Sequence, residues 1–403
     1  MRVLVLDGNQ NQAVAAVRSL SRAGHYVLVG EADSWSKAGW SRLCHGTFRY
    51  PPPQKSGGAF LARVVEIARG QPGTLVLPMT EATTLPLSAN REAVFRAGAR
   101  MVLPEHRDLV RAFDKAETTR VAASAGIAVP KTFLISTPAD LGRVREIIPF
   151  PVVLKPRSSE ELDPLGAVRT GGKPRYARNQ AELEEAYQLV SPASSGVLAQ
   201  EFVDGEGAGY FALMHKGELR AEFAHRRIRD VRPTGSGSAV RVSVEPDPAI
   251  RQVSLDLLKA LNWHGVAMVE FRQRPGKPPV FMEVNGRFWH SLALPCAAGV
   301  DFPALVARMA EDGDIPVAAP LRAGIRCRWF LGDFRHLIEV FRGAPAGYPR
   351  AFPGRLRTLA DVLTPVAGTH HDLFEWHDPL PEIGDWLNFA RRLLRMRGSE
   401  RPT

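Results

Sequence analysis

Apolar and polar positions in the first hundred residues follow strand-like and helix-like periods in turn. Residues 2–6 form a short apolar run, Gly8 opens a turn, and apolar positions from 13 to 20 recur at helical spacing until Gly24. Apolar runs at 25–34 and 74–80, with a helical pattern at about 58–69, predict further strands. This order is typical of a parallel sheet covered by helices, so residues 1–107 are expected to form an α/β domain.

The first turn, DGNQNQA, argues against dinucleotide binding. NAD-type sites need the spacing G-x-G-x-x-G there, because the later glycines admit the pyrophosphate and let the helix pack on the strand. Only Gly8 is present in this turn. A tight turn in a parallel sheet is the better interpretation.

From residue 108 the pattern changes. A helical stretch ends at Gly126, a strand follows Pro130, a helix reaches about residue 147, and the strand PFPVVLKP ends in a lysine. Residues 157–174 mix acidic, basic and glycine residues without a period, which predicts a mobile loop. A helix at 179–189 leads to the strand VLAQEFVDG, and the second unit is expected to span 108–199.

Short apolar runs joined by tight turns such as HKGE and RPGK dominate the next segment. They predict antiparallel hairpins around one helix at about 247–262, and a third unit over 200–319. Residues 320–403 are richer in Pro, His and Trp and end in a basic helix. We expect them to form a C-terminal extension.

Composition narrows the class of protein. The 403 residues suit two or three domains, and Cys44, Cys296 and Cys327 lie too far apart to form a disulfide framework, which favours a reduced, cytoplasmic protein. The first apolar run is too short for a signal peptide or a membrane span.

The net charge of +10 suits anionic partners, but its distribution matters more. The last 18 residues hold five arginines, at 391, 392, 395, 397 and 401, against Glu400. Trp386, Phe389, Leu393 and Leu394 share one face of this helix, which favours packing on the protein body over contact with an anionic membrane. The other basic stretch, 225–241, lacks interleaved aromatic residues, which disfavours nucleic-acid binding.

Acidic residues within two apolar runs carry the strongest chemical signal. Glu270 and Glu283 lie on strands that a hairpin would pair, and Glu283 and Asn285 point to the same face of their strand. Carboxylate and amide oxygens are ligands that Mg²⁺ prefers. The alternative is an exposed polar hairpin face, but a carboxylate buried in an apolar run needs a partner, so metal binding is favoured.

Two lysines could bind a triphosphate. Lys115 stands near a helix start, and Lys155 ends an apolar strand before a polar loop. Each alone is more typical of a surface lysine. Farther along, His290 is interpreted as a packed residue beside the metal strand, whereas His370, His371 and His377 lack any motif of metal ligands.

The motifs FDKAETT, PVVLKP, AQEFVDGEG, MVEFR and FMEVNGR occur in an order that resembles the ATP-grasp superfamily. The similarity covers about residues 1–310 and is greatest to its branches like carbamoyl-phosphate synthase and D-alanine:D-alanine ligase. It implies a Rossmann-like pre-ATP-grasp α/β lobe, an α+β ATP-grasp core and a C-terminal extension. Within the core, 108–199 would be the smaller subdomain with the loop that covers the nucleotide, and 200–319 the larger one with the metal site.

The resemblance also implies roles for individual residues. Lys115 and Lys155 would hold ATP phosphates, and Glu270, Glu283 and Asn285 would bind Mg²⁺, with Mn²⁺ as a substitute. Arg287 would stabilise the transferred phosphoryl group. Arg227 and Arg241 are candidates for binding a substrate carboxylate, although a solvated basic strand pair explains them equally well. The adenosine would be bound at the strand end formed by Gln200, Glu201, Phe202, Val203 and Glu206.

The implied reaction joins a carboxylate to an amine through an acyl-phosphate and releases ADP and phosphate. The substrates would be small and amino-acid-like. Activation of the carboxylate for a thiol or hydroxyl acceptor, and a non-catalytic nucleotide-binding or membrane-associated scaffold, are the alternatives. Whether the chain forms a homodimer stays open at this point.

Overall fold

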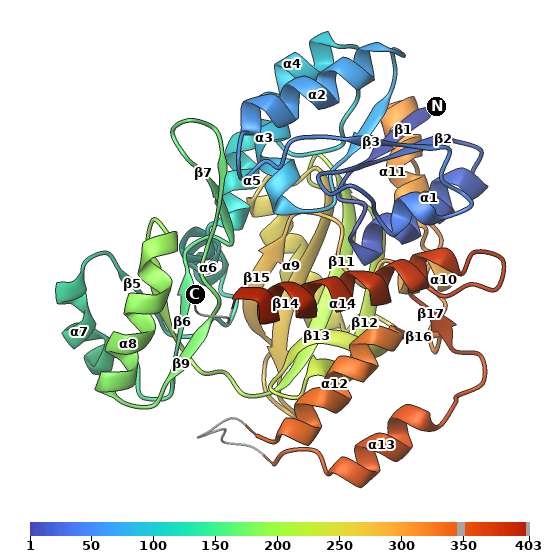
Figure 1. Ribbon diagram of the computed structural model, residues 1–403. Coiled ribbons are helices and arrows are strands. Elements are labelled where there is room, and N and C mark those ends of the chain that lie inside the picture. Colours follow the sequence, from blue (N-terminus) through green and yellow to red (C-terminus); the bar gives the residue numbers. More distant parts are fainter. Residues whose placement is uncertain (345–350, 400–403) are drawn as a thin grey trace.

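The computed structural model describes residues 1–344 and 351–399. Its first hundred residues form a parallel sheet with the strand order β3-β2-β1-β4, at the upper right of Figure 1. Side chains alternate between its faces, so one face packs on α1 and the other on α2 and α4. The elements of this lobe are β1 (Arg2–Val5), α1 (Asn11–Arg22), β2 (Tyr26–Glu31), β3 (Gly46–Arg49), α2 (Gly57–Arg69), β4 (Leu75–Leu77), α3 (Glu81–Ala89) and α4 (Arg91–Arg96).

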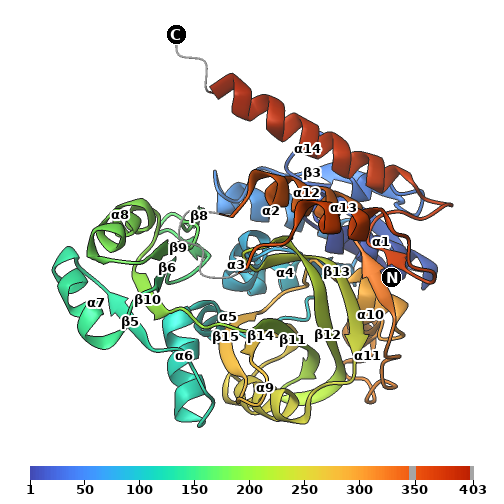
Figure 2. The ribbon, with the colours of Figure 1, turned by 90° about the horizontal axis from the view of Figure 1, so that it is seen from below.

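A smaller antiparallel sheet follows, with the order β5-β10-β6-β9. Its apolar face packs on α7 and α8, and in Figure 2 the group lies to one side of the molecule. Its elements are β5 (Thr132–Ile135), α7 (Leu141–Ile147), β6 (Val152–Pro156), β9 (Arg175–Ala177), α8 (Gln180–Val190) and β10 (Val197–Glu201). Short 3₁₀ helices occupy Ala38–Trp40, Pro138–Asp140 and Ser191–Ala193.

Residues 157–174, predicted to be an irregular mobile loop, contain a hairpin of β7 (Glu160–Leu162) and β8 (Val168–Thr170). The hairpin contacts the N-terminal lobe. The Val168 amide donates to the Pro53 carbonyl at 3.0 Å. A Cβ on Gly57 would lie 1.8 Å from the Gly166 carbonyl oxygen, so this contact requires glycine at the start of α2.

The large sheet has the order β15-β14-β11-β12-β13-β16-β17. One face packs on α5, α6 and α9, and the other packs on α1, α10 and α11, so it shares a core with the N-terminal lobe. The predicted hairpins are confirmed for β11–β12 and β14–β15. The elements are α5 (His106–Phe113), α6 (Lys115–Ser124), β11 (Glu206–His215), β12 (Glu218–Arg232), β13 (Ser236–Val244), α9 (Pro248–Ala260), β14 (Gly265–Gln273), β15 (Val280–Asn285), α10 (Ala293–Ala297) and α11 (Phe302–Asp312).

The residues after 320 add two strands to the edge of the large sheet and three helices, among them α14, which crosses in front of the sheet in Figure 1. They are β16 (Arg326–Arg328), α12 (Phe330–Arg342), α13 (Arg355–Leu363), β17 (His370–His371) and α14 (Leu380–Ser399). None of the described helices is both long and apolar enough to cross a bilayer.

Buried ion pairs attach this C-terminal segment to the rest of the chain. Arg18 Nε lies 2.9 Å from Asp378 Oδ2, and Lys37 Nζ lies 2.7 Å from Asp385 Oδ1. Arg241, on β13, pairs with Asp372 beyond β17, and both side chains are at most 1% exposed. Because such charges are costly to bury unpaired, each pair fixes one contact of the segment.

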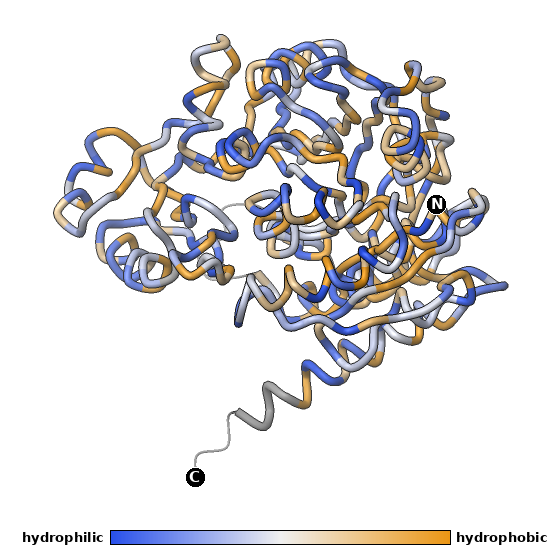
Figure 3. The backbone as a smooth tube through the Cα atoms, turned by 90° about the horizontal axis from the view of Figure 1, so that it is seen from above, coloured by the Kyte–Doolittle hydropathy of each residue, from blue (hydrophilic) through white to orange (hydrophobic). Residues whose placement is uncertain are grey.

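The predicted apolar face of the last helix is only partly covered. Trp386 and Phe389 pack against the core that the two lobes share, whereas Leu394 is 69% exposed. Figure 3 shows the helix leaving the body toward the C-terminus. The side chains of 395, 397 and 401, which belong to the predicted basic face, lie outside the described residues.

Replacing Arg241 by Met should destabilise the fold by about 3–5 kcal/mol, because Asp372 would remain buried without its counter-charge. Arg178→Met is the matched control, since its pair with Glu182 at the start of α8 is solvent-screened and should contribute little to stability. Urea unfolding followed by circular dichroism measures both. Equal shifts of the two unfolding midpoints would contradict a structural role for Arg241.

Candidate functional site

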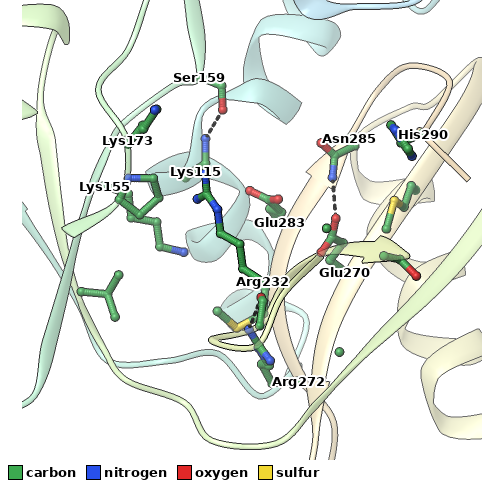
Figure 4. A pocket seen from close by; sticks show the side chains of 18 of the residues that line it. Lys115, Lys155, Ser159, Lys173, Arg232, Glu270, Arg272, Glu283, Asn285 and His290 are labelled. Atoms are coloured by element: carbon green, nitrogen blue, oxygen red, sulfur yellow. Dashed lines mark hydrogen bonds between the residues drawn. The ribbon is translucent and has the colours of Figure 1, made fainter. Parts of the chain in front are cut away.

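A cavity of about 810 Å³ lies between the small and the large sheet. The small sheet contributes Lys155 and Gln200, and the large sheet contributes Glu270, Glu283 and Asn285. In Figure 4 the lysines stand on one side and the acidic residues on the other. The C-terminal segment contributes further residues, which sequence reasoning did not assign to a site.

The two predicted lysines meet because of Asp114, which separates α5 from α6 and places Lys115 at the helix start that the sequence indicated. Its Oδ1 caps α6 by accepting from the amides of Ala116 and Glu117 at 2.9 and 3.1 Å. Its Oδ2 accepts from Arg157 Nε at 2.8 Å, just after β6. This bond joins the first residue of α6, Lys115, to the strand that carries Lys155.

The ammonium groups of Lys115 and Lys155 lie in a partly buried environment. Burial lowers the pKa of Lys155 to about 8, opposed by Glu283 and reinforced by Lys115. Lys115 Nζ donates to Ser159 Oγ at 3.0 Å. Lys173, from the segment after β8, lines the same cavity and was not predicted. Its glycine-rich surroundings, TGGKP, were the available signal.

Glu270 and Glu283 face each other across the hairpin, as predicted from the sequence. Asn285 Nδ2 donates to Glu270 Oε1 at 3.2 Å. Burial raises the pKa of Glu270, with Arg227 opposing and Glu283 adding to the effect. Burial also disfavours ionisation of Glu283, but the charges of Lys115 and Lys155 outweigh it and lower its pKa. Two ionised carboxylates that face each other repel, so a cation bound between them would stabilise both.

The oxygen donors of this hairpin fit a hard divalent cation such as Mg²⁺. Within residues 1–344 and 351–399, no three His, Cys, Asp or Glu side chains are grouped to hold a metal by themselves. The third protein oxygen would therefore come from Asn285, and phosphate and water would complete the shell. Gly286 keeps the strand close to the core, since a Cβ there would lie 2.4 Å from the Trp263 ring.

Arg287 reaches the same cluster from the following turn. One of its Nη atoms donates to Asn285 Oδ1 at 3.1 Å, and its Nε lies 3.6 Å from Glu81 of the N-terminal lobe. Glu160 of the β7–β8 hairpin also lines the cavity. Burial raises the pKa of Glu160 to about 7, with a smaller contribution from Glu81. The N-terminal lobe thus supports the arginine through an acid that the sequence did not single out.

The predicted adenosine-binding residues fall into two groups. Gln200, Glu201, Phe202 and Val203 line the cavity at the end of β10. Val203 is 8% exposed, and its backbone makes no hydrogen bond within the described part of the chain. A backbone N–H and C=O without partners are suited to hydrogen bonding with the edge of a nucleotide base. Glu206 is exposed at the start of β11 and does not line the cavity.

The structure separates the two arginines that were predicted to bind a carboxylate. Arg227 lines the cavity, and one of its Nη atoms lies 3.2 Å from Glu270 Oε2. Arg241 is fully buried and directed at Asp372, away from the cavity lining. The expected substrate-binding role of Arg241 is therefore not supported, because its charge is already neutralised inside the fold.

Comparison with known proteins identifies the core. Residues 198–332 match the family model described as "ATP-grasp in the biosynthetic pathway with Ter operon". This segment of the chain is therefore similar to an ATP-grasp domain. The D-alanine–D-alanine ligase of Nitrosospira multiformis is 27% identical over 216 residues, which cover 49% of this chain and 66% of the ligase, just under two thirds of its length.

Solved structures show that the ATP-grasp fold extends beyond the matched segment. The L-amino acid ligase of Bacillus licheniformis aligns with a TM-score of 0.57 at 18% identity, covering 77% of this chain and 73% of that one. The biotin carboxylase domain of the 2-oxoglutarate carboxylase of Hydrogenobacter thermophilus, solved with MgADP and bicarbonate, aligns with a TM-score of 0.60 at 17% identity, covering 81% and 73%. The expected mixed α/β fold with an ATP-grasp core is thus confirmed.

Replacing Lys155 by Met should weaken binding of Mg·AMP-PNP, a non-hydrolysable ATP analogue, by about tenfold or more, because a charge-assisted phosphate contact is lost. Lys259→Met, at the exposed end of α9, is the control and should leave the affinity unchanged. Isothermal titration calorimetry gives both dissociation constants. An unchanged constant for Lys155→Met would remove this lysine from the nucleotide site.

Proposed function

We propose that the protein is an ATP- and Mg²⁺-dependent ligase that joins a small carboxylate to an amine through an acyl-phosphate. The observation that carries this proposal is that Lys115 and Lys155 face Glu270, Glu283 and Asn285 in one shared cavity. Cations on one wall suit a triphosphate, and oxygen donors on the other suit its divalent cation.

The chemistry needs charge neutralisation and alignment rather than a side-chain nucleophile. An oxygen of the substrate carboxylate attacks the γ-phosphorus of ATP, and the bond to the bridging oxygen of ADP breaks. The amine then attacks the acyl carbon, phosphate leaves with the bonding pair, and the amine loses a proton to water or phosphate. Bound Mg²⁺ would supply positive charge to the phosphate oxygens.

The protein's own cations would stabilise the charge that moves during these steps. Lys115 and Lys155 would hold the β- and γ-phosphate oxygens. Arg287, which is 26% exposed and directed by Asn285 and Glu81, would face the phosphoryl group in flight. The β7–β8 hairpin would cover the phosphates and limit access of water, which would otherwise hydrolyse the acyl-phosphate.

The relatives favour an amide-forming reaction over other uses of the fold. The curated relatives include D-alanine–D-alanine ligases, and a structural neighbour is an L-amino acid ligase. We therefore infer amino-acid-like substrates for this chain. Transfer to a thiol or hydroxyl acceptor, and a role as a nucleotide-binding scaffold, are the alternatives that the next experiment separates.

Purified protein with Mg·ATP should release ADP when given the right pair from pooled amino acids and small carboxylates, and Glu283→Gln should reduce this release by at least about 100-fold. Coupled pyruvate kinase and lactate dehydrogenase report the ADP. Adding hydroxylamine should trap the acyl-phosphate as a hydroxamate, detected by mass spectrometry.

Glu185→Gln, on the exposed face of α8, is the matched control and should retain full turnover. Hydroxamate formation without an amide product for any amine would point to another acceptor. Binding of Mg·AMP-PNP without ADP release from any pool would contradict the ligase proposal and favour the scaffold.

A further inference from the structure

The wall of the cavity beyond the acidic hairpin includes side chains from the C-terminal segment. Trp329 and Arg335, at the start and middle of α12, line it together with Trp289 and His290. His290 and Trp329 lie in ring contact, with centroids 4.5 Å apart. In Figure 4, His290 is on the far side of Asn285 from Lys155. This end of the cavity therefore lies past the face proposed for Mg²⁺.

Positive charge gathers at this end without a matching acid. Arg335 lies over the Trp329 ring, 5.9 Å from its centroid, and Arg232 of β12 lines the cavity as well. Burial lowers the pKa of Arg335, and the charges of Arg232 and of Arg392 on α14 lower it further. Among the described residues, neither the Arg335 nor the Arg232 guanidinium makes a hydrogen bond or an ion pair.

The acids whose charges act on Arg335, Asp385 and Glu339, are engaged elsewhere. Asp385 Oδ1 lies 2.7 Å from Lys37 Nζ, and Asp385 Oδ2 accepts from Trp329 Nε1 at 2.7 Å. Glu339 accepts from Arg342 at 3.0 Å. Two converging arginines whose acidic neighbours are occupied form a site for an external anion.

Two buried side chains at the same end of the cavity carry polar atoms without partners. Trp289 is 2% exposed and His225 is 3% exposed, and both line the cavity. The indole Nε1 of Trp289 and both ring nitrogens of His225 have no hydrogen-bond partner within the described residues. Because leaving a buried polar atom unpaired is unfavourable, bound water or a polar ligand is expected to satisfy them.

We propose that this end of the cavity binds a second anionic group, a carboxylate or a phosphate, on the substrate of the ligase, with Arg335 as its principal partner and Arg232 beside it. The inference deepens the proposed function and rests on it. The aromatic wall of Trp329 and His290 would contact the body of the substrate. Burial lowers the pKa of His290 to about 4, so this ring is neutral at pH 7 and adds no charge.

Asp385 is a positioning residue in this arrangement. It joins Lys37 of the N-terminal lobe to the Trp329 indole, and both of these side chains are buried. The face that Trp329 presents to the cavity therefore depends on α14 being docked. The substrate class is set by the C-terminal segment, outside the elements that carry the lysines and the acidic hairpin.

The test measures binding to protein saturated with Mg·AMP-PNP, so that the nucleotide site is filled. Isothermal titration calorimetry compares glutarate with butyrate, and O-phosphoserine with serine. In the wild type, glutarate or O-phosphoserine, which carry the second anionic group, should bind about tenfold more tightly than butyrate or serine respectively, as a charge-assisted contact predicts. The pair with the larger ratio distinguishes a carboxylate from a phosphate. Equal binding within both pairs, or no binding of either dianion, would overturn the proposal.

Arg335→Gln should bring that ratio to within about threefold of unity and leave the dissociation constant of Mg·AMP-PNP unchanged. The matched control is Arg357→Gln on α13, whose side chain is exposed and should not affect the ratio. A ratio that Arg335→Gln leaves intact would overturn the role of this arginine.

The two proposals fail separately. One outcome is that the wild type prefers the dianion, Arg335→Gln abolishes this preference, and no substrate pool gives ADP release. This outcome would sustain the anion site and refute the proposed ligase activity. The opposite outcome is that the enzyme turns over a substrate without a second anionic group and that Arg335→Gln leaves its KM unchanged. This outcome would sustain the ligase activity and refute the anion site.

Discussion

The close approach of Glu270 and Glu283 across one hairpin is the constraint around which the site is organised. Two buried carboxylates repel each other, and burial alone would keep both protonated. Positive groups from the smaller sheet, the large sheet and the following turn compensate: Lys155, Arg227 and Arg287 all act on this pair. These cations come from separate parts of the chain, so the hairpin is an ionised oxygen site only when the small sheet is packed against the large one.

The same principle explains how the C-terminal segment is attached. Its contacts with the body use charged pairs that are almost fully buried, Arg18 with Asp378, Lys37 with Asp385 and Arg241 with Asp372. An apolar interface would tolerate sliding, whereas a buried pair fixes both position and orientation, because a displaced partner leaves an unpaired charge. Because this segment supplies part of the cavity wall, its buried ion pairs also fix the position of that wall.

Sequence reasoning found the acidic hairpin and both lysines because each lies at a recognisable place in a strand or helix. It was wrong about Arg241, whose partner Asp372 is 131 residues away, whereas the adenosine-binding role of Glu206, which faces solvent, stays a prediction. It also treated residues 157–174 as irregular, because a hairpin of three-residue strands has too few positions for a period to appear. Trp329 and Arg335 were missed because nothing local in their sequence indicates a site.

The sequence by itself determined many of the strands and helices, the pairing of Glu270 with Glu283 and the chemistry of the lysines, since these depend on local periodicity and on short hairpins. The tertiary structure alone decided which arginines are free to meet a ligand. An arginine is neutralised or available according to the acids that surround it, and those acids come from distant segments. The long-range docking of α12 and α14 therefore determines the proposed substrate end of the cavity.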